Sequence, residues 1–385
     1  MPWNFLDVTK AADVPAELTA ITAACTYVFD EQATQHVDFA GGDGHIHELW
    51  WDATGWHHND LTERTGAPVL SAQSRANGPT GYIFAAEGTQ HVVFVGEESG
   101  DAGHIHELWW NNDGWHHHDL TEAASAPLAM AVTPGAYVFD WLGTQHVHYV
   151  DKQGNIHELW WEKERWHHRN LTKDFGAPIA AHGISVGPPA GYAPFGGNTQ
   201  YVTYLGEDGS IQELEWKSGK WKHTNLSTHT GAPRSCHSPS AYAFAIGDTR
   251  HVNYVGFDGH AHELRFEGTW HWDDLTDATG ATPGDDAVLC AYPFTANCTR
   301  HVAYTNASGR IHHLWWKAGV WQHDDLSDTS GALLSDFVPL SGYAVNFQRT
   351  QHVIYNEIEH LHVCQLWWEE RHIRTPDISG TVVIS

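Results

Sequence analysis

Five glutamates occupy one equivalent position in a recurring motif, His-Ile-His-Glu-Leu-Trp-Trp or a close variant of it. In the first three copies a tryptophan stands two residues later, so in a β-strand both side chains point to one face. A carboxylate on such an aromatic face needs a partner, either a protein group or a ligand hydroxyl. An aromatic wall with a few fixed polar groups is the mixture that sugar pockets require. These residues are Glu48, Glu107, Glu158, Glu213 and Glu263, with Trp50, Trp109 and Trp160.

A second motif, Thr-Gln-His-Val, places a histidine on the expected neighbouring strand, where it could orient the glutamate or donate to a ligand hydroxyl. Each group also has a purely structural interpretation. The glutamate could be a surface carboxylate, the tryptophan could pack between units, and the histidine could be hydrogen-bonded within the protein. The later copies are less complete, because Tyr201 replaces the histidine of unit four and Glu215 and Arg265 replace the tryptophan of units four and five. His313 and Gln365 replace the glutamate of units six and seven. The histidines are His36, His91, His146 and His251, followed by His301 and His352.

Neither catalysis nor metal binding is indicated. A glycoside hydrolase needs two carboxyl groups in one asymmetric site, whereas the carboxylates of this chain are spread over equivalent positions. The GxSxG and HExxH motifs are absent from the sequence. Adjacent histidines such as His116 and His117 alternate between strand faces, and no closed set of metal ligands recurs. We therefore expect no catalytic residue, no metal site and no cofactor.

The motif recurs at intervals of roughly 50–60 residues, a period typical of stacked or ring-shaped repeat folds. Its clearest copies are 44–51 and 103–110; five further copies begin at Asn155, Ser210, His260, Arg310 and His360. Each unit also carries a tyrosine in an apolar run, the Thr-Gln-His-Val motif, and a Trp-x-x-x-(Asp/Asn)-Leu-Thr segment. These runs are short, rich in β-formers and bounded by turn residues. They predict four antiparallel strands per unit.

Both faces of the predicted strands carry large apolar groups. In unit two, Ile105, Glu107 and Trp109 share one face, and the opposite face holds Leu108 and Trp110. A small sheet that is covered on both faces by copies of itself predicts an all-β, seven-bladed β-propeller. Residues 3–9 match the fourth segment of a unit that lacks its other segments, so we expect them to supply the outer strand of blade seven. The tail 371–385 is a competing candidate for that position.

We expect one domain over residues 1–385, with residues 1–15 contributing the outer strand of blade seven. The expected blades span approximately residues 20–66, 75–125, 130–176, 185–231, 237–280, 286–331 and 337–385.

The composition narrows the class of partner. The formal charge of −27, with histidine neutral, argues against nucleic acid or an anionic membrane surface. The sequence has no transmembrane segment and no recognisable signal peptide. We therefore expect a soluble protein, either cytoplasmic or released by another route. Cys290 and Cys298 could pair across a hairpin or remain buried thiols.

The ordered motifs together resemble those of the PLL-type bacterial lectins over nearly the whole chain. That resemblance implies a seven-bladed propeller that binds fucose and related, including O-methylated, sugars between its blades. It also implies oligomers, commonly dimers or tetramers. A more distant similarity to six-bladed fungal fucose lectins implies a basic residue and a glutamate at the sugar. His91 and Glu107 occupy those positions here, with histidine in place of arginine.

The expected function is multivalent, non-enzymatic binding of fucosylated or O-methylated glycans on cell surfaces or glycoconjugates, without membrane insertion. Units one to three should carry the strongest sites, and units four and five weaker ones. A protein-interaction scaffold and a glycoside hydrolase are the alternatives.

Overall fold

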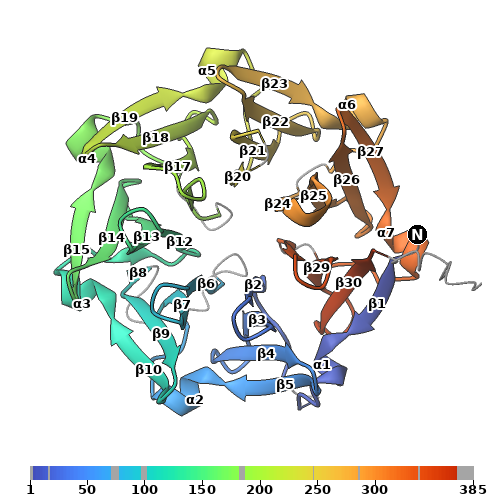
Figure 1. Ribbon diagram of the computed structural model, residues 1–385, viewed down its shortest axis with the longest axis horizontal. Helices are drawn as coiled ribbons and strands as arrows, with labels where there is room; N and C mark the ends of the chain where they lie inside the picture. The colour runs from blue at the N-terminus through green and yellow to red at the C-terminus, as the bar shows by residue number, and fades with distance from the viewer. Residues whose placement is uncertain are drawn as a thin grey trace, which may run out of the picture.

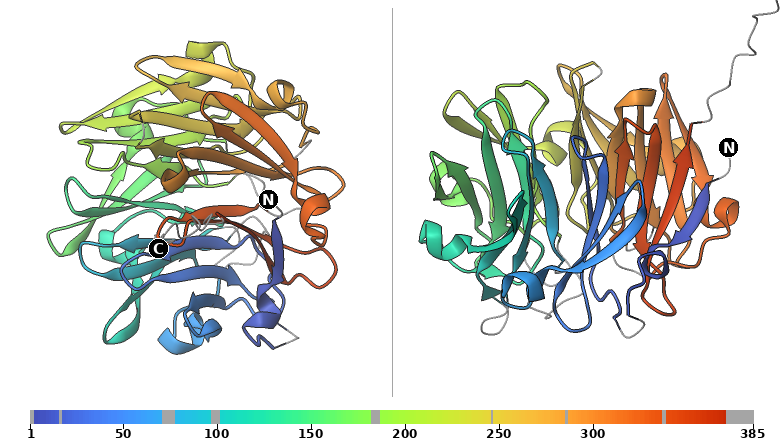
Figure 2. Two further views of the ribbon diagram at one scale, coloured as in Figure 1. Left: turned by 45° about the vertical axis from the view of Figure 1, so that its right-hand side comes forward. Right: turned by 60° about the horizontal axis from the view of Figure 1, so that its bottom comes forward.

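Each repeat folds into a four-stranded antiparallel sheet, and the seven sheets stand as blades around a central axis (Figure 1). The computed structural model describes residues 3–15, 18–70, 78–96, 102–181, 187–245, 247–284, 287–336 and 339–370. Figure 2 turns the ring and shows the blades side by side around that axis. The fold is therefore the expected seven-bladed β-propeller.

Within each of blades one to six, the first strand in the chain is innermost and the fourth is outermost. Blades one to three contain β2 (Cys25–Phe29), β3 (Thr34–Ala40), β4 (Ile46–Asp52) and β5 (Gly55–Asp60); β6 (Thr80–Phe84), β7 (Thr89–Val95), β9 (Ile105–Asn111) and β10 (Gly114–Asp119); and β12 (Gly135–Phe139), β13 (Thr144–Val150), β14 (Ile156–Glu162) and β15 (Arg165–Asn170). Blades four to six contain β16 (Ala190–Tyr192), β17 (Thr199–Leu205), β18 (Ile211–Lys217) and β19 (Lys220–Asn225); β20 (Ser240–Phe244), β21 (Thr249–Val255), β22 (Ala261–Phe266) and β23 (Trp270–Asp274); and β24 (Cys290–Phe294), β25 (Thr299–Thr305), β26 (Ile311–Lys317) and β27 (Val320–Asp325). A small additional sheet pairs β8 (Ala102–Gly103) with β11 (Ala129–Met130).

Blade seven combines strands from both ends of the chain. It contains β28 (Ser341–Val345), β29 (Thr350–Asn356) and β30 (Val363–Glu369), and its outer strand is β1 (Asn4–Asp7). β1 pairs antiparallel with β30, in a register that places Phe5 opposite Leu366, and the two lie side by side in Figure 1. The expectation that the N-terminal segment closes the ring is confirmed. The competing segment 371–385 lies outside the described residues.

A short helix follows each described outer strand, and the Asp-Leu-Thr sequence explains it. Asp274 caps α6 (Leu275–Thr279) by accepting a hydrogen bond from the backbone N–H of Asp277 at 2.9 Å. Leu275 is buried, and Thr276 Oγ1 accepts from the first N–H of β22 at 2.9 Å. The other helices are α1 (Val8–Ala11), α2 (Leu61–Thr65), α3 (Leu120–Ala124), α4 (Leu171–Phe175), α5 (Leu226–Thr230), α7 (Leu326–Ser330) and the 3₁₀ turn η1 (Thr295–Asn297).

The hydrophobic core is divided among the interfaces between blades. One cluster joins Tyr27 and Leu61 of blade one to Val92 and Leu108 of blade two. All seven residues of β3 are buried, as expected for a strand that is covered on both faces. Packing between blades therefore holds the ring together.

Two smaller findings complete the fold. Cys290 and Cys298 form no disulfide; the former is buried and the latter exposed. Within the part of the chain that the structure describes, no helix is long and apolar enough to cross a membrane.

Candidate functional site

Each blade presents its inner tyrosine, its histidine and its glutamate or substitute to the next blade along the chain. The Tyr82 hydroxyl of blade two donates to Gln145 Oε1 of blade three at 2.9 Å. Across the ring closure, the Tyr343 hydroxyl of blade seven donates to Gln35 Oε1 of blade one, also at 2.9 Å. We call the space between two such faces a seam and number it by its blades, so seam 2/3 lies between blades two and three.

Strand register brings the sequence-predicted residues together on this face. In blade two, Tyr82 lies opposite His91, His91 opposite Trp109, and Trp109 opposite His116. Glu107 lies in the adjacent row of the same face, opposite Val93. The histidine, glutamate and tryptophan of a unit are therefore neighbours, as strand alternation predicts.

Each glutamate of this set is buried and has a protein partner. His36 Nδ1 lies 2.8 Å from Glu48 Oε1, and its Nε2 lies 2.8 Å from Thr34 Oγ1. Because a carboxylate only accepts, His36 Nδ1 donates to Glu48, and the threonine holds the other ring nitrogen. The same Thr–His–Glu chain occurs in units two, three and five, with His–Glu distances of 2.9 Å for His91–Glu107, His146–Glu158 and His251–Glu263.

The surroundings set the charge of these carboxyl groups. Burial opposes ionisation of Glu158, but the hydrogen bond from His146 and the nearby imidazole of His148, at 3.7 Å, lower its pKa to about 2. In unit four Tyr201 stands in place of the histidine, and burial raises the pKa of Glu213 to about 7 in spite of the adjacent Arg250. The repeated positions are therefore not electrostatically equivalent.

The tryptophan two residues beyond the glutamate is half-buried and stacks on a histidine of the outer strand. The ring centroids of Trp109 and His116 are 4.2 Å apart, and those of Trp50 and His57 are 4.3 Å apart. Trp160 stacks on the corresponding histidine at 4.9 Å. These contacts fix the indole rings in the seam, where they form an aromatic wall.

A cavity of about 290 Å³ lies in seam 6/7. Trp315 comes from blade six, whereas Trp3 and Trp368 come from blade seven, so three indoles border the cavity. Trp315 Nε1 donates to the Asp324 carboxylate at 3.0 Å. The remaining lining residues are Asn297, Thr299, His301, His313, Lys317, Thr329 and Gln351. The cavity thus combines apolar walls with a few polar groups, as saccharide pockets do.

Two neutral imidazoles replace the usual histidine–carboxylate pair in this cavity. His301 Nδ1 lies 2.9 Å from His313 Nε2, and the two rings are nearly parallel. Burial lowers the pKa of His313 to about 3 and holds that of His301 well below its usual range. His313 Nδ1 has no hydrogen-bond partner among the described residues. These two imidazoles are therefore uncharged at neutral pH, whereas Lys317 and Asp324 bring charged groups to the lining.

Solved structures that are similar to this chain include bacterial and fungal lectins. No protein-family model matches the chain, and no curated protein matches it. The BP39L lectin from Burkholderia pseudomallei is similar over 91% of this chain and 96% of its own, at 17% identity and a TM-score of 0.68. AofleA from Arthrobotrys oligospora is similar over 84% and 89%, at 14% identity and a TM-score of 0.53. The fucose-specific lectin from Aleuria aurantia covers 84% and 97%, at 16% identity and a TM-score of 0.50.

The chain has the propeller fold of these lectins. On this fold the predicted sets of units one to three lie in seams 1/2, 2/3 and 3/4. The sequence predicts no strong site in unit six, because His313 stands where the glutamate is expected, yet the cavity lies there. The retained Trp315 was a signal for this seam. The contribution of Trp3 follows only from the pairing of β1 with β30.

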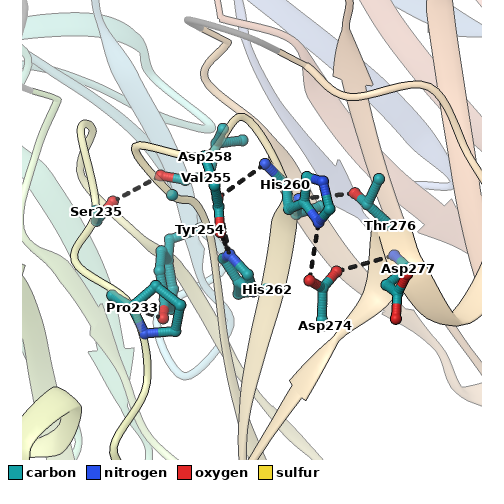
Figure 3. A network of polar contacts seen from close by, with 12 residues as sticks. Pro233, Ser235, Tyr254, Val255, Asp258, His260, His262, Asp274, Thr276 and Asp277 are labelled. Carbon is teal, nitrogen blue, oxygen red and sulfur yellow. Dashed lines mark hydrogen bonds and ion pairs between the residues drawn. The ribbon is translucent and has the colours of Figure 1, made fainter.

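The repeated histidine–aspartate pairs of the propeller lie at the blade corners. Figure 3 shows the corner of blade five, where His260 Nδ1 lies 2.8 Å from Asp274 Oδ2. In blade one, ligand atoms of Asp43, His45 and Asp60 lie within 4.8 Å of one another, a spacing that could hold a metal ion. Their polar atoms already have protein partners, since Asp60 caps α2 and bonds His45 at 2.7 Å. This group stabilises the corner.

Proposed function

We propose that the protein is a multivalent lectin that binds saccharides in the seams between its blades. The observation that carries this proposal is the cavity of seam 6/7, which is walled by Trp3, Trp315 and Trp368 and contains a few polar groups. The apolar face of a pyranose ring stacks on an indole, and its hydroxyls need fixed hydrogen-bonding partners. The cavity offers both.

Fucose-like or O-methylated sugars are the proposed ligands. Two proteins with this fold are described as a fucose-specific lectin and as a lectin in complex with alpha methyl fucoside. A deoxysugar methyl or an O-methyl group adds apolar surface, which suits a pocket bordered by indoles.

The residues predicted in units one to three supply the corresponding positions in seams 1/2, 2/3 and 3/4. We propose that the indoles form the walls there and that the glutamates accept from sugar hydroxyls while the histidines hold them. These residues are His36, Glu48 and Trp50; His91, Glu107 and Trp109; and His146, Glu158 and Trp160. Several weak sites on one rigid ring raise avidity on a glycan-coated surface by roughly 10²–10⁴.

A glycan array probed with the labelled full-length protein tests this function. We expect binding to fucosylated or O-methylated glycans, and agglutination of glycosylated cells that free fucose or an O-methylated sugar inhibits. A protein that binds no glycan on the array would contradict the proposal.

We propose that the seams bind sugars without cleaving them. Two carboxyl groups must flank the bond in most glycoside hydrolases, whereas Asp324 is the sole carboxylate among the described residues that line the cavity. The protein should release no nitrophenol from a nitrophenyl fucoside. Release of nitrophenol by the wild-type protein, if it is abolished by a substitution in a seam, would overturn this part of the proposal.

A further inference from the structure

The residue just before the seam histidine differs among the seven repeats. It points to the opposite face of the blade and therefore into the preceding seam. Five repeats have glutamine at this position and two have arginine. The glutamines are Gln35, Gln90, Gln145, Gln200 and Gln351, and the arginines are Arg250 and Arg300.

Arg300 fills seam 5/6. Its Nη1 donates to Glu263 Oε1 at 2.8 Å, although the two residues lie in different blades. The guanidinium carbon is 4.3 Å from the ring centroid of Trp316 and 5.3 Å from that of Trp321. The side chain is only 4% exposed. One arginine thus contacts both the carboxylate of blade five and two indoles of blade six.

Arg250 does the same in seam 4/5. Its Nη1 donates to Glu213 Oε2 at 2.8 Å. The guanidinium carbon lies 3.9 Å from the ring centroid of Tyr201 and 4.3 Å and 4.9 Å from those of Phe266 and Trp270. The rings come from both sides of the seam, so the cation is enclosed between the two blades.

The glutamines behave differently. The Tyr82 hydroxyl donates to Gln145 Oε1 in seam 2/3, and the Tyr343 hydroxyl donates to Gln35 Oε1 in seam 7/1. These two amides bond the tyrosine of the innermost strand, whereas in seam 1/2 the Tyr27 hydroxyl and Gln90 Oε1 have no hydrogen-bond partner among the described residues. In the part of the chain that the structure describes, no glutamine at this position bonds the glutamate of its seam. No described arginine bonds the glutamate in seams 1/2, 2/3 and 3/4. In seam 3/4 the guanidinium carbon of Arg169, from blade three itself, lies 5.3 Å from the ring centroid of Trp160.

A second position changes together with the first. The wall tryptophan is present in all five seams that have glutamine and absent from both seams that have arginine, where Glu215 and Arg265 replace it. Arg265 pairs with Asp273 at 3.2 Å. The wall tryptophans are Trp50, Trp109, Trp160, Trp315 and Trp367. The two positions lie in different repeats, yet they change in the same seams.

We propose that Arg250 and Arg300 are internal plugs that close seams 4/5 and 5/6 to saccharides, leaving five binding seams in the ring. This inference rests on the proposed lectin function and specifies which seams perform it. A sugar could enter a plugged seam only by separating a buried ion pair and taking the cation from its aromatic rings, and both changes are unfavourable. Glu213, His251 and Glu263 are accordingly removed from the expected binding residues, whereas seams 6/7 and 7/1 are added.

Equilibrium dialysis with methyl α-L-fucoside counts the sites directly. The full-length wild-type chain should bind five fucosides at saturation. The double variant Arg265→Trp/Arg300→Gln gives seam 5/6 the histidine, glutamate, tryptophan and glutamine found in seam 2/3, and it should bind six. The reverse change, Gln145→Arg, should plug seam 2/3 and leave four. Exposed Arg64→Gln in α2 is the matched control and should leave five.

The outcomes separate this inference from the function on which it rests. Two results would show that Arg250 and Arg300 do not close their seams, and both would leave the lectin function intact. One is a wild-type protein that binds seven fucosides. The other is a wild-type protein that binds five, with the same number bound by both seam variants. Wild type that binds no fucoside and no array glycan would overturn both. Thermal melting checks the fold of each variant, and the two seam variants change the count in opposite directions. Misfolding of one therefore leaves the other as the test.

Discussion

At the scale of single residues, the seam depends on the position and surroundings of each side chain. The same glutamate position holds a carboxylate whose pKa is lowered to about 2 in unit three and one whose pKa is raised to about 7 in unit four. In unit six, His313 occupies the position and stays neutral. A motif therefore identifies a binding seam only together with the residues that face it from the next blade.

Trp315→Ala should remove one wall of the cavity in seam 6/7 and weaken binding there. We expect about a tenfold loss of affinity or more at that site, because the indole supplies much of the apolar contact area. Titration followed by NMR chemical shifts can separate this site from the others. Trp141→Ala is the matched control, since Trp141 is 59% exposed in a hairpin outside the seams. Equal effects of the two substitutions would argue against a site in the cavity.

At the scale of elements, the capped turn after each outer strand fixes the blade corner. Asp274→Ala removes the cap of α6 and the partner of His260. We expect the free energy of unfolding to fall by about 1–2 kcal/mol, measured by urea denaturation. Asp274→Asn is the control, because Asn170 and Asn225 cap the equivalent helices. A variant with alanine that is as stable as the one with asparagine would show that the cap contributes little.

The sequence predicts the elements well and the seams only in part. Alternation places Glu107 and Trp109 on one face, and the unmatched N-terminal segment indicates ring closure, because both are local patterns. Contacts across a seam are not local. Arg300 and Glu263 are 37 positions apart in the chain, as are Arg250 and Glu213, and the two members of each pair belong to different motifs. Strand alternation within one motif therefore cannot join them. Trp3 and Trp315 border the same cavity only because the N-terminal β1 pairs with β30 in blade seven.

At the scale of the whole molecule, buried neutral histidines link stability to pH. Burial lowers the pKa of His313 and of His352 to about 3, whereas an unfolded chain has histidine pKa values near 6.5. Between these pH values the unfolded state binds more protons than the folded state. The contribution of these histidines to the free energy of unfolding is therefore fully present above about pH 7 and is lost as the pH decreases. Each such histidine should cost about 1.4 kcal/mol per pH unit in that window.

His313→Gln tests this linkage, because Gln365 occupies the same position in unit seven. The variant should lose less stability than wild type between pH 7 and pH 4.5, as measured by urea denaturation at each pH. Parallel pH profiles for the two proteins would show that His313 is not responsible.

Crystals grown with methyl α-L-fucoside would show where the sugar binds. We expect electron density for the sugar in seam 6/7, with its ring against Trp315, Trp3 or Trp368, and none in seams 4/5 and 5/6. Electron density for the fucoside found only outside the seams, at a saturating concentration, would contradict the claim that this propeller binds saccharides between its blades.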